Sequence, residues 1–508
     1  MNTRAHVATD YLIGVDVGTS STKAVAFTID GRRLATGRAP QTTYVDPQGG
    51  VRQDAESWWL SLVDAVSAVV LPESACIGIG ITSQIGTHVA LGSDLEPIEP
   101  AWTWQDGQAS VVLPGLEKSV DASALASDLQ TWIPSGPTWP IPRMLWLRDH
   151  QAKTFERTKF LALPKDYLLY RLTGVFATDS SSWRGLVSPN GEVHSRVLDS
   201  LNLPDLVPPR LNADAFAGSL RPHVAERLGL PESVPVFVGS SDYSCALVGA
   251  GVHSEGDAFD IGGTSEHLGF LSTSRPTSPN AIAVSYPPAD VPGSFVGYGV
   301  SSNGGGVTEW LGNVLLPAHS PTNRHAELAL LAQQVPAGSD EVLFLPYIRG
   351  ERSPIWDSAA SGAWIGLRSH HGPSHLTRSA LEGVAFNLRE IRDTLPAMPF
   401  GTVLRSTGGT ARSDVWNEIK AAVLATPIAV MGELEAGALG AAIYAAIGLG
   451  IYPSAGDAMR SMTRVAHVVE PRSELLGIYD AAYDHFQQVS KNHLTSAYTS
   501  NRRRTIHA

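Results

Sequence analysis

The chain has 508 residues, 43% of them hydrophobic and 17% charged, so it is long enough for two to four domains with large buried cores. Its formal net charge of -12 disfavours nucleic acid or an anionic membrane surface as the main partner. The only two cysteines, Cys76 and Cys245, are expected to be reduced and partly buried. The N-terminal residues contain no apolar core like that of a signal peptide, so we expect a cytoplasmic protein.

The first predicted elements are three strands. Residues 11–17 and 21–29 are apolar runs, and the Asp-Gly pair that follows them is typical of a hairpin turn before a third strand over 32–37. Residues 54–70 have helical spacing of apolar side chains, with an aspartate placed as the cap. Residues 76–83 then predict a buried strand. The chain is therefore expected to start with a three-stranded meander, a helix and a strand.

The second half repeats this order. An apolar run ends at Asp260, a Gly-Gly-Thr-Ser turn follows, and another apolar run begins. A long helix is predicted over 375–395, and residues 401–430 have the pattern of strand, glycine turn, helix and strand. The uncharged segment 436–453 is short and rich in Ala and Gly, which predicts a buried helix rather than a membrane span. Two copies of one α/β unit are expected, and two chance hairpins are the alternative.

The turn of Gly18, Thr19 and Ser20 follows a strand that ends near Asp16. Such a turn exposes backbone N–H groups, and Gly18 lets the backbone approach a ligand closely. The hydroxyls of Thr19 and Ser20 can donate to phosphate oxygens, and Lys23 can add a positive charge. Asp16 is placed where a carboxylate can hold Mg²⁺ through water. The sequence therefore predicts a phosphate site, and an ordinary hairpin is the alternative.

Two further glycine turns lie in the second half. The Gly-Gly-Thr-Ser turn could hold a polyphosphate together with the first turn, and the Gly-Gly-Thr turn after the strand near residue 404 would let a flat base lie against bare backbone. A Walker A loop is absent from the sequence. The nucleotide-binding residues predicted in this half are Gly262, Gly263, Thr264, Gly305, Gly408, Gly409, Ser413 and Asn417.

Five segments together resemble the FGGY carbohydrate kinases, a family that includes xylulose, gluconate, glycerol and ribulose kinases. They are the loop from Asp16 to Lys23, the Gly-Gly-Thr-Ser and Gly-Gly-Thr turns, and residues 163–179 and 345–357. The likeness extends from about residue 12 to residue 452. It implies an α/β protein of two actin-like (RNase H-like) domains, 1–250 and 251–508, in which ATP, Mg²⁺ and a sugar meet in a central inter-domain cleft. It also implies a homodimer.

The resemblance assigns the catalytic role to Asp242. This residue follows an apolar run and a small-residue turn, and in the family its position is the general base that takes a proton from the sugar hydroxyl. Asp242 is also predicted to help Asp16 hold the metal ion. The alternative is that Asp242 only caps a helix that begins at Tyr243.

The predicted sugar contacts are Gln84, Trp104, Asp106, Asp242 and Tyr243. Two positions depart from the xylulose kinase pattern, since Gly86 replaces a histidine and Gln108 replaces an arginine. The sugar is therefore left as a xylulose-like pentulose or gluconate, and a role for His88 is left open. Glu266 directly follows the second turn, and its carboxylate is expected to point away from the phosphates.

Two other classes of protein compete with a kinase. An actin-like protein that uses ATP to drive binding or polymerisation would share the paired turns, but it does not need a base beside a sugar pocket. A degenerate kinase that senses sugar would fit the altered sugar-site residues.

Overall fold

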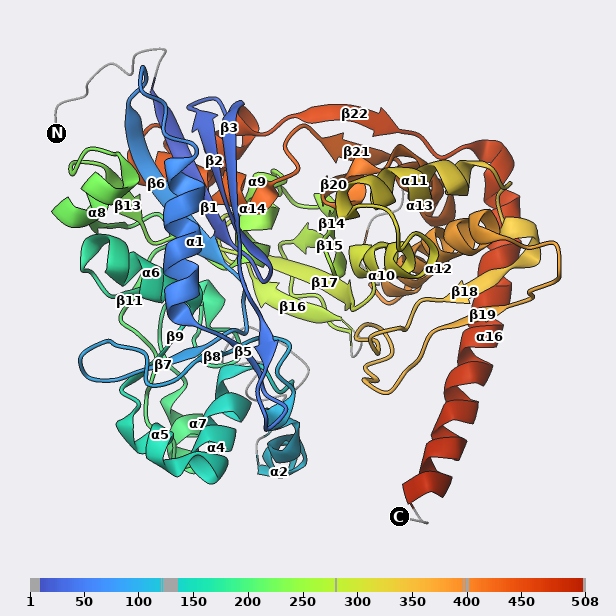
Figure 1. Ribbon diagram of the computed structural model, residues 1–508, viewed down its shortest axis with the longest axis horizontal. Coiled ribbons are helices and arrows are strands. Elements are labelled where there is room, and N and C mark those ends of the chain that lie inside the picture. Colours follow the sequence, from blue (N-terminus) through green and yellow to red (C-terminus); the bar gives the residue numbers. More distant parts are fainter. Residues whose placement is uncertain are drawn as a thin grey trace. The chain divides into compact units, whose positions relative to one another are not determined.

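The computed structural model describes residues 10–119, 121, 136–278, 281–395, 398 and 402–505. Its internal contacts divide the chain into two compact units (Figure 1). The first comprises Met1–Ser254, Ala283–Ser294 and Glu435–Arg464, and the second comprises Glu255–Ile282, Phe295–Leu434 and Val465–Ala508. The predicted domain boundary near residue 250 stays a prediction. The compact units divide the chain differently, since the late segment Glu435–Arg464 belongs to the first unit.

Strands and helices alternate along the first unit. Its strands are β1 (Tyr11–Val17), β2 (Ser21–Thr28), β3 (Arg33–Pro40), β4 (Tyr44–Val45), β5 (Val51–Gln53), β6 (Cys76–Ser83), β7 (Val89–Leu91), β8 (Ala101–Trp102), β9 (Phe160–Ala162), β10 (Thr178–Asp179), β11 (Arg210–Leu211), β12 (Phe216–Ser219) and β13 (Pro235–Phe237). Its helices are α1 (Ala55–Ser67), α2 (Leu113–Ser119), α4 (Pro140–His150), α5 (Ala152–Arg157), α6 (Pro164–Thr173), α7 (Ser195–Ser200), α8 (Pro222–Leu228), α9 (Asp242–Gly249), α14 (Ala436–Gly448) and α15 (Ala455–Met462), with short 3₁₀ helices η1 (Gln108–Val112) and η2 (Ser180–Ser182).

The second unit has the same alternation. Its strands are β14 (Ala258–Gly262), β15 (Glu266–Ser272), β17 (Phe295–Ser301), β18 (Leu343–Leu345), β19 (Ala363–Ile365), β20 (Leu404–Gly408), β21 (Ile428–Met431) and β22 (Val465–Val469). Its helices are α10 (Gly305–Leu315), α11 (Pro321–Gln333), α12 (Pro373–Asp393), α13 (Asp414–Leu424) and α16 (Ser473–Thr505), with η3 (Ser339–Glu341) and η4 (Thr410–Arg412). Strand β16 (Ile282–Ser285) lies where the chain passes from the second unit to the first.

The main sheet of the first unit has the strand order β12-β13-β6-β1-β2-β3. Strands β1, β2 and β3 form the predicted antiparallel meander, and β6 pairs with β1 in parallel after helix α1. The predicted opening of meander, helix and strand is therefore confirmed. The register of the first hairpin places Asp16 opposite Lys23, so the turn between them ends at two charged residues.

Successive residues of β1 and β6 face opposite sides of this sheet. Ile13 and Ile79 belong to the apolar core that includes the side chains of α1. Gly14 and Gly80 point the other way, onto α14, whose backbone approaches so closely that a Cβ atom at either glycine would overlap a helix carbonyl oxygen. Helix α14 is thus the buried Ala- and Gly-rich helix predicted for this segment.

Gly14→Ala is expected to destabilise the first unit because its Cβ would overlap the carbonyl oxygen of Ala438, and a backbone atom cannot rotate away. We expect a loss of about 1–3 kcal/mol in the free energy of unfolding, measured by urea denaturation. The matched control is Gly115→Ala, whose Cβ would meet nothing within 4 Å. Equal effects of the two substitutions would contradict the close packing of α14 on the sheet.

The second unit repeats the strand pairing of the first. The strands of its sheet that lie wholly within this unit have the order β17-β15-β14-β20-β21-β22, with β14 antiparallel to β15 and parallel to β20. Strands β15 and β17 are antiparallel, whereas β20 and β21 are parallel. These are the pairing directions of β3-β2-β1-β6-β13 in the first unit. The expectation of two copies of one α/β unit is confirmed, and two chance hairpins are excluded as its explanation.

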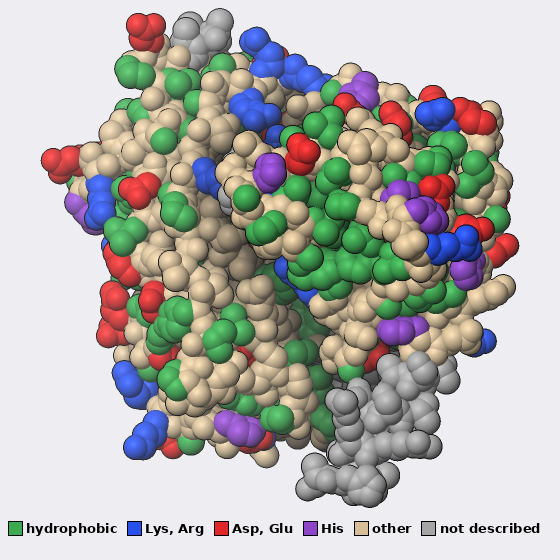
Figure 2. Space-filling view, turned by 45° about the vertical axis from the view of Figure 1, so that its right-hand side comes forward, with side chains coloured by type: hydrophobic (Ala, Val, Ile, Leu, Met, Phe, Trp, Pro, Cys, Tyr) green, Lys and Arg blue, Asp and Glu red, His purple; other side chains and the backbone are tan. Residues whose placement is uncertain are grey.

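Charged side chains of the described residues do not gather into a patch of one sign on the visible surface (Figure 2). On the face that Figure 2 shows, acidic and basic side chains are interspersed. Within the described ranges, no helix is both long enough and apolar enough to cross a membrane. Cys76 and Cys245 are both buried, and neither forms a disulfide.

Candidate active site

The first glycine turn connects β1 to β2 and is held by its own backbone and by side chains. The N–H of Gly18 donates to the carbonyl oxygen of Ser21 at 3.1 Å, which closes the turn. The Thr19 hydroxyl donates to Gln84 Oε1 at 2.9 Å and accepts from Trp104 Nε1 at 2.7 Å. Thr19 therefore joins the predicted phosphate turn directly to two of the predicted sugar contacts. Ser20, at the tip of the turn, is exposed.

Gln53, a residue that sequence reasoning missed, stabilises this network. Its Nε2 donates to the carbonyl oxygen of Thr19 at 2.6 Å, and its Oε1 accepts from Gln84 Nε2 at 2.7 Å and from Trp58 Nε1 at 2.9 Å. The Gln53 side chain is fully buried. A polar residue before a predicted helix was its only sequence signal, and this signal is common.

Asp242 is the first residue of α9 and lies beside the carboxyl end of β6. Its Oδ1 accepts from the backbone N–H of Tyr243 at 2.8 Å and of Ile85 at 3.3 Å. Burial and, to a smaller extent, the negative charge of Asp16 raise the pKa of Asp242 to about 7, although the two N–H donors and the Arg184 charge lower it. A carboxyl group whose pKa is near neutrality can exchange a proton at physiological pH.

The carboxylate of Asp16 contributes to a negatively charged site at the end of β1. Burial raises the pKa of Asp16 to about 6, while the Lys23 ammonium lowers it and the Glu435 carboxylate raises it. Within the described part of the chain, no group donates a hydrogen bond to the enclosed Asp16 Oδ1. Two neighbouring carboxylates with raised pKa values, Asp16 and Asp242, provide the oxygen ligands that Mg²⁺ prefers. These residues therefore fit a divalent cation.

Lys23 has a protein partner in this structure. Its Nζ lies 2.6 Å from Glu435 Oε2, just before α14. This ion pair links the first hairpin to the late segment of the chain. A contact between Lys23 and phosphate stays a prediction.

Asp106 and His88 lie deeper than the sequence suggested. Both are buried, and Asp106 accepts from Arg143 Nη1 at 2.8 Å and from the N–H of Val51 at 2.9 Å. Burial lowers the pKa of His88 to about 3, so this imidazole is neutral, and its ring lies 5.7 Å from that of Trp183. These hydrogen bonds and ring contacts hold both side chains inside the first unit, away from its surface. Sugar binding by Asp106 stays a prediction.

In the second unit, the Gly-Gly-Thr-Ser turn packs against the start of α10. The N–H of Gly263 donates to Ser265 O at 2.8 Å, and the N–H of Gly305 donates to Gly263 O at 2.7 Å. Gly263 and Thr264 are exposed at the tip of the turn. The predicted nucleotide residue Gly305 is thereby brought next to the predicted phosphate turn.

The third glycine turn contacts the second. Gly408 has a φ of +89°, and a Cβ there would overlap the carbonyl oxygen of Gly262. A Cβ at Gly262 would in turn overlap the hydroxyl of Thr410. Gly409 is exposed, and a Cβ there would meet nothing within 4 Å. The two turns therefore form one surface on this unit, with open space over Gly409.

Helix α13 begins directly after this turn. Ser413 occupies its N-cap position but its side chain makes no capping hydrogen bond. Asn417 is fully buried and its Nδ2 donates to the carbonyl oxygen of Ala411 at 2.8 Å. Asn417 thus stabilises the backbone of the turn, and direct contact of either residue with adenosine stays a prediction.

A fully buried charged cluster, comprising Lys420, Asp260, Glu266 and Thr410, lies behind the two turns. Lys420 Nζ lies 2.8 Å from Asp260 Oδ2 and also contacts Glu266 Oε1, and no side chain of these three ionisable residues is exposed. Thr410 Oγ1 donates to Glu266 Oε1 at 3.0 Å. Burial and the charge of Asp260 raise the pKa of Glu266 to about 8, although Lys420 lowers it. Sequence reasoning missed Lys420, whereas the carboxylate of Glu266 does point into the protein.

Comparisons with known proteins agree with these features. The model of the FGGY family of carbohydrate kinases, N-terminal domain, matches residues 11–249, and that of the C-terminal domain matches residues 260–449. A xylulose kinase of Bacillus subtilis (strain 168) is 27% identical over 492 residues, 94% of this chain and 96% of that protein. A gluconokinase of the same strain is 26% identical over 462 residues, 87% and 88% of the two chains. The solved structure of ligand-bound xylulose kinase from Lactobacillus acidophilus matches with a TM-score of 0.85 and 24% identity, covering 97% of this chain and 99% of that one.

Proposed function

Because the chain belongs to the FGGY family of carbohydrate kinases, we propose that it transfers the γ-phosphate of ATP to a hydroxyl of a small sugar or sugar acid, a xylulose-like pentulose or gluconate. Membership of this family makes the chain an ATP-dependent sugar phosphotransferase. The identity of the acceptor, a xylulose-like pentulose or gluconate, is what we propose beyond that. The observation that carries the proposal is Asp242, a carboxyl group with a pKa of about 7 at the start of α9. It accepts from the backbone N–H of Ile85, the residue after Gln84, and the Gln84 side chain bonds to Thr19 of the first glycine turn. The cytoplasmic location and the homodimer stay predictions.

Asp242 acts as the general base in this proposal. Two backbone N–H groups hold its Oδ1, so we assign the proton of the acceptor hydroxyl to Oδ2. Phosphoryl transfer depends mainly on positioning and on neutralising charge, and a base of near-neutral pKa completes it by removing the proton. Mg²⁺ held by Asp16 and Asp242 would supply charge neutralisation at the phosphates.

Binding of the two substrates is assigned to the two units. Gln84, Trp104 and Tyr243 offer an amide, an aromatic face and a phenol to a sugar, with Asp106 behind them. In the second unit, Thr264 and Gly409 offer exposed backbone N–H groups to ATP, and the bare backbone of Gly263 and Gly409 offers it a flat surface. The remaining predicted contacts are Gly18, Ser20, Lys23, Gly262, Gly305, Gly408, Ser413 and Asn417.

The test of the proposal is ADP release measured across a panel of pentuloses, gluconate and polyols. At least one acceptor is expected to raise ADP release well above the rate without sugar. If no acceptor did so while the protein polymerised or bound peptide with ATP, the actin-like alternative would replace the proposal. If sugar and nucleotide bound without turnover in calorimetry, the chain would be a sensor.

Trp104→Phe keeps an aromatic ring but removes the Nε1 donor to Thr19. The loss of one hydrogen bond is worth about 0.5–1.5 kcal/mol, so we expect kcat/KM for the best acceptor to fall roughly 2- to 12-fold. Trp364→Phe is the control, since it removes a similar donor, to Ser379 at 3.2 Å, in the second unit. An unchanged kcat/KM in Trp104→Phe would show that the Thr19–Trp104 bond does not position the turn.

A further inference from the structure

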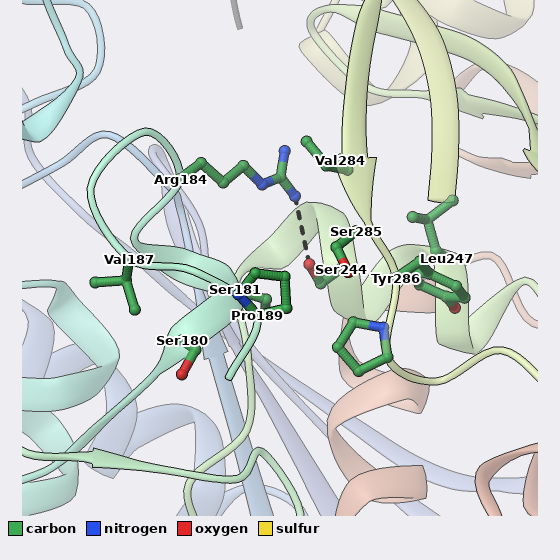
Figure 3. Close-up of a pocket in the computed structure, with 11 residues that line it drawn as sticks. Ser180, Ser181, Arg184, Val187, Pro189, Ser244, Leu247, Val284, Ser285 and Tyr286 are labelled. Carbon is green, nitrogen blue, oxygen red and sulfur yellow. Dashed lines mark hydrogen bonds between the residues drawn. The ribbon is translucent and has the colours of Figure 1, made fainter. Parts of the chain in front are cut away.

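A small open pocket lies in the first unit beside helix α9 (Figure 3). It is not part of the predicted sugar contacts. Hydroxyl groups and one positive charge dominate its polar lining, which includes Ser180, Ser181, Arg184, Ser244 and Ser285. None of the described residues that line this pocket is an aspartate or a glutamate. Such a lining complements a ligand with an anionic group.

Arg184 connects this pocket to the catalytic carboxyl group. Its side chain is largely buried, because only 7% of the residue is exposed. Its guanidinium carbon lies 4.9 Å from the ring centre of Tyr243, and its Nη2 donates to Ser244 Oγ at 3.4 Å. Both partners follow Asp242 in α9, and Figure 3 shows the Arg184–Ser244 contact at the side of the pocket. The positive charge of Arg184 also lowers the pKa of Asp242.

We propose that Arg184 binds the carboxylate of the acceptor, so that the substrate is a short sugar acid rather than a neutral sugar. This inference rests on the proposed kinase function and names its substrate class. A guanidinium offers paired N–H donors that match both oxygens of a carboxylate, and the hydroxyls of Ser180, Ser244 and Ser285 can donate further hydrogen bonds. Because Arg184 stacks on the residue that follows Asp242, a carboxylate held there and a hydroxyl held by Asp242 can belong to one small molecule.

The carboxylate takes no part in the chemical step. The bond that forms joins the acceptor hydroxyl oxygen to the γ-phosphorus, and the bond that breaks releases ADP. The hydroxyl proton passes to Asp242. Arg184 therefore acts on binding and on discrimination between acceptors, through a charge-assisted hydrogen bond that a neutral sugar cannot make.

The experiment compares aldonates of four to six carbons with the alditols of the same length, by steady-state kinetics and by calorimetric binding. The wild-type protein is expected to favour an aldonate in both measurements. Arg184→Met is expected to lower kcat/KM and affinity for this aldonate roughly 10- to 100-fold, and to lower both values for the alditol much less. Arg184→Lys is expected to restore part of the loss, because the charge returns without the paired donors.

Arg221→Met is the matched control, since Arg221 also stacks on a tyrosine, Tyr170, at 4.9 Å in the same unit but outside the pocket. Its preference for the aldonate is expected to equal that of the wild type. A wild-type preference for neutral sugars would overturn the inference while leaving the kinase function intact. An equal loss for aldonate and alditol in Arg184→Met would also overturn it, because Arg184 would then act on Asp242 alone. Absence of turnover with every acceptor would instead contradict the kinase function itself.

Discussion

Asp242→Asn is expected to lower kcat roughly 10²- to 10⁴-fold, because an amide cannot accept the proton of the acceptor hydroxyl. The substitution keeps the size of the side chain and an oxygen that can still accept from the N–H groups of Tyr243 and Ile85. Nucleotide and sugar affinity, measured by calorimetry, are therefore expected to change much less than kcat. Turnover within a few-fold of the wild type would show that Asp242 is not the base.

The pH dependence follows from the raised pKa of Asp242. The base works when deprotonated, so kcat/KM of the wild type is expected to be constant above pH 7 and to fall about tenfold per pH unit below it. The residual activity of Asp242→Asn is expected to lack this decline. A wild-type profile that stayed constant down to pH 5 would mean that the base has a pKa below 5, which would contradict the assignment of this role to Asp242 with its pKa of about 7.

Stability is expected to change in the opposite direction from activity. The pKa of Asp242 is about 7 in the folded protein, above its usual value of 3.8, so the folded state binds more protons than the unfolded state between these values. The ionised carboxyl group therefore destabilises the fold as pH rises through this window. Asp242→Asn removes that penalty and is expected to raise the melting temperature at pH 8, whereas the exposed control Asp94→Asn is expected to leave it unchanged.

Lys420→Met is expected to destabilise the protein more strongly than Gly14→Ala does. It would leave Asp260 and Glu266 buried together without their shared ammonium group. Removal of one partner from a buried ion pair costs about 3–5 kcal/mol, measurable as a lower urea midpoint for unfolding. Thr410, in the third glycine turn, donates a hydrogen bond to Glu266 of this cluster. Because this turn is part of the proposed ATP site, Lys420→Met is expected to weaken ADP binding as well.

The double variant Lys420→Met with Glu266→Gln separates charge from packing. It removes one positive and one negative charge, and it is expected to recover at least half of the lost stability, because only Asp260 remains charged. Lys153→Met, at an exposed position, is the control for loss of a lysine. If the double variant were no more stable than Lys420→Met, packing rather than charge would explain the loss.

Local patterns carried most of the prediction of the fold. The strands at Tyr11–Val17 and Cys76–Ser83 lie where their apolar runs predicted them, because each run is bounded by charged, small or turn-forming residues. Helix α1 begins at Ala55, directly after Asp54, as the predicted cap position requires, but the side chain of this aspartate makes no capping hydrogen bond. The sequence can thus predict the residue at the N-cap position correctly even when its side chain makes no capping hydrogen bond.

Interactions between distant segments could not be predicted in this way. Lys23 and Glu435 are separated by 412 positions, and Lys420 and Glu266 by 154. No periodicity or motif relates such residues, because only the folded sheet brings them together. The same reason explains why Arg184 carried no sequence signal and Gln53 only a common one, although both contact residues that the motifs had identified.

The discontinuous composition of the first unit has a consequence for biosynthesis. The face of β1 and β6 that carries Gly14 and Gly80 is covered by α14, which begins only at Ala436. A nascent chain that has emerged as far as α9 therefore still lacks the helix that completes its sheet. Contacts of such long sequence separation form slowly, and the uncovered face is an aggregation hazard until they form. Production of the protein is thus expected to depend on chaperones that hold early chains until the last quarter has been translated.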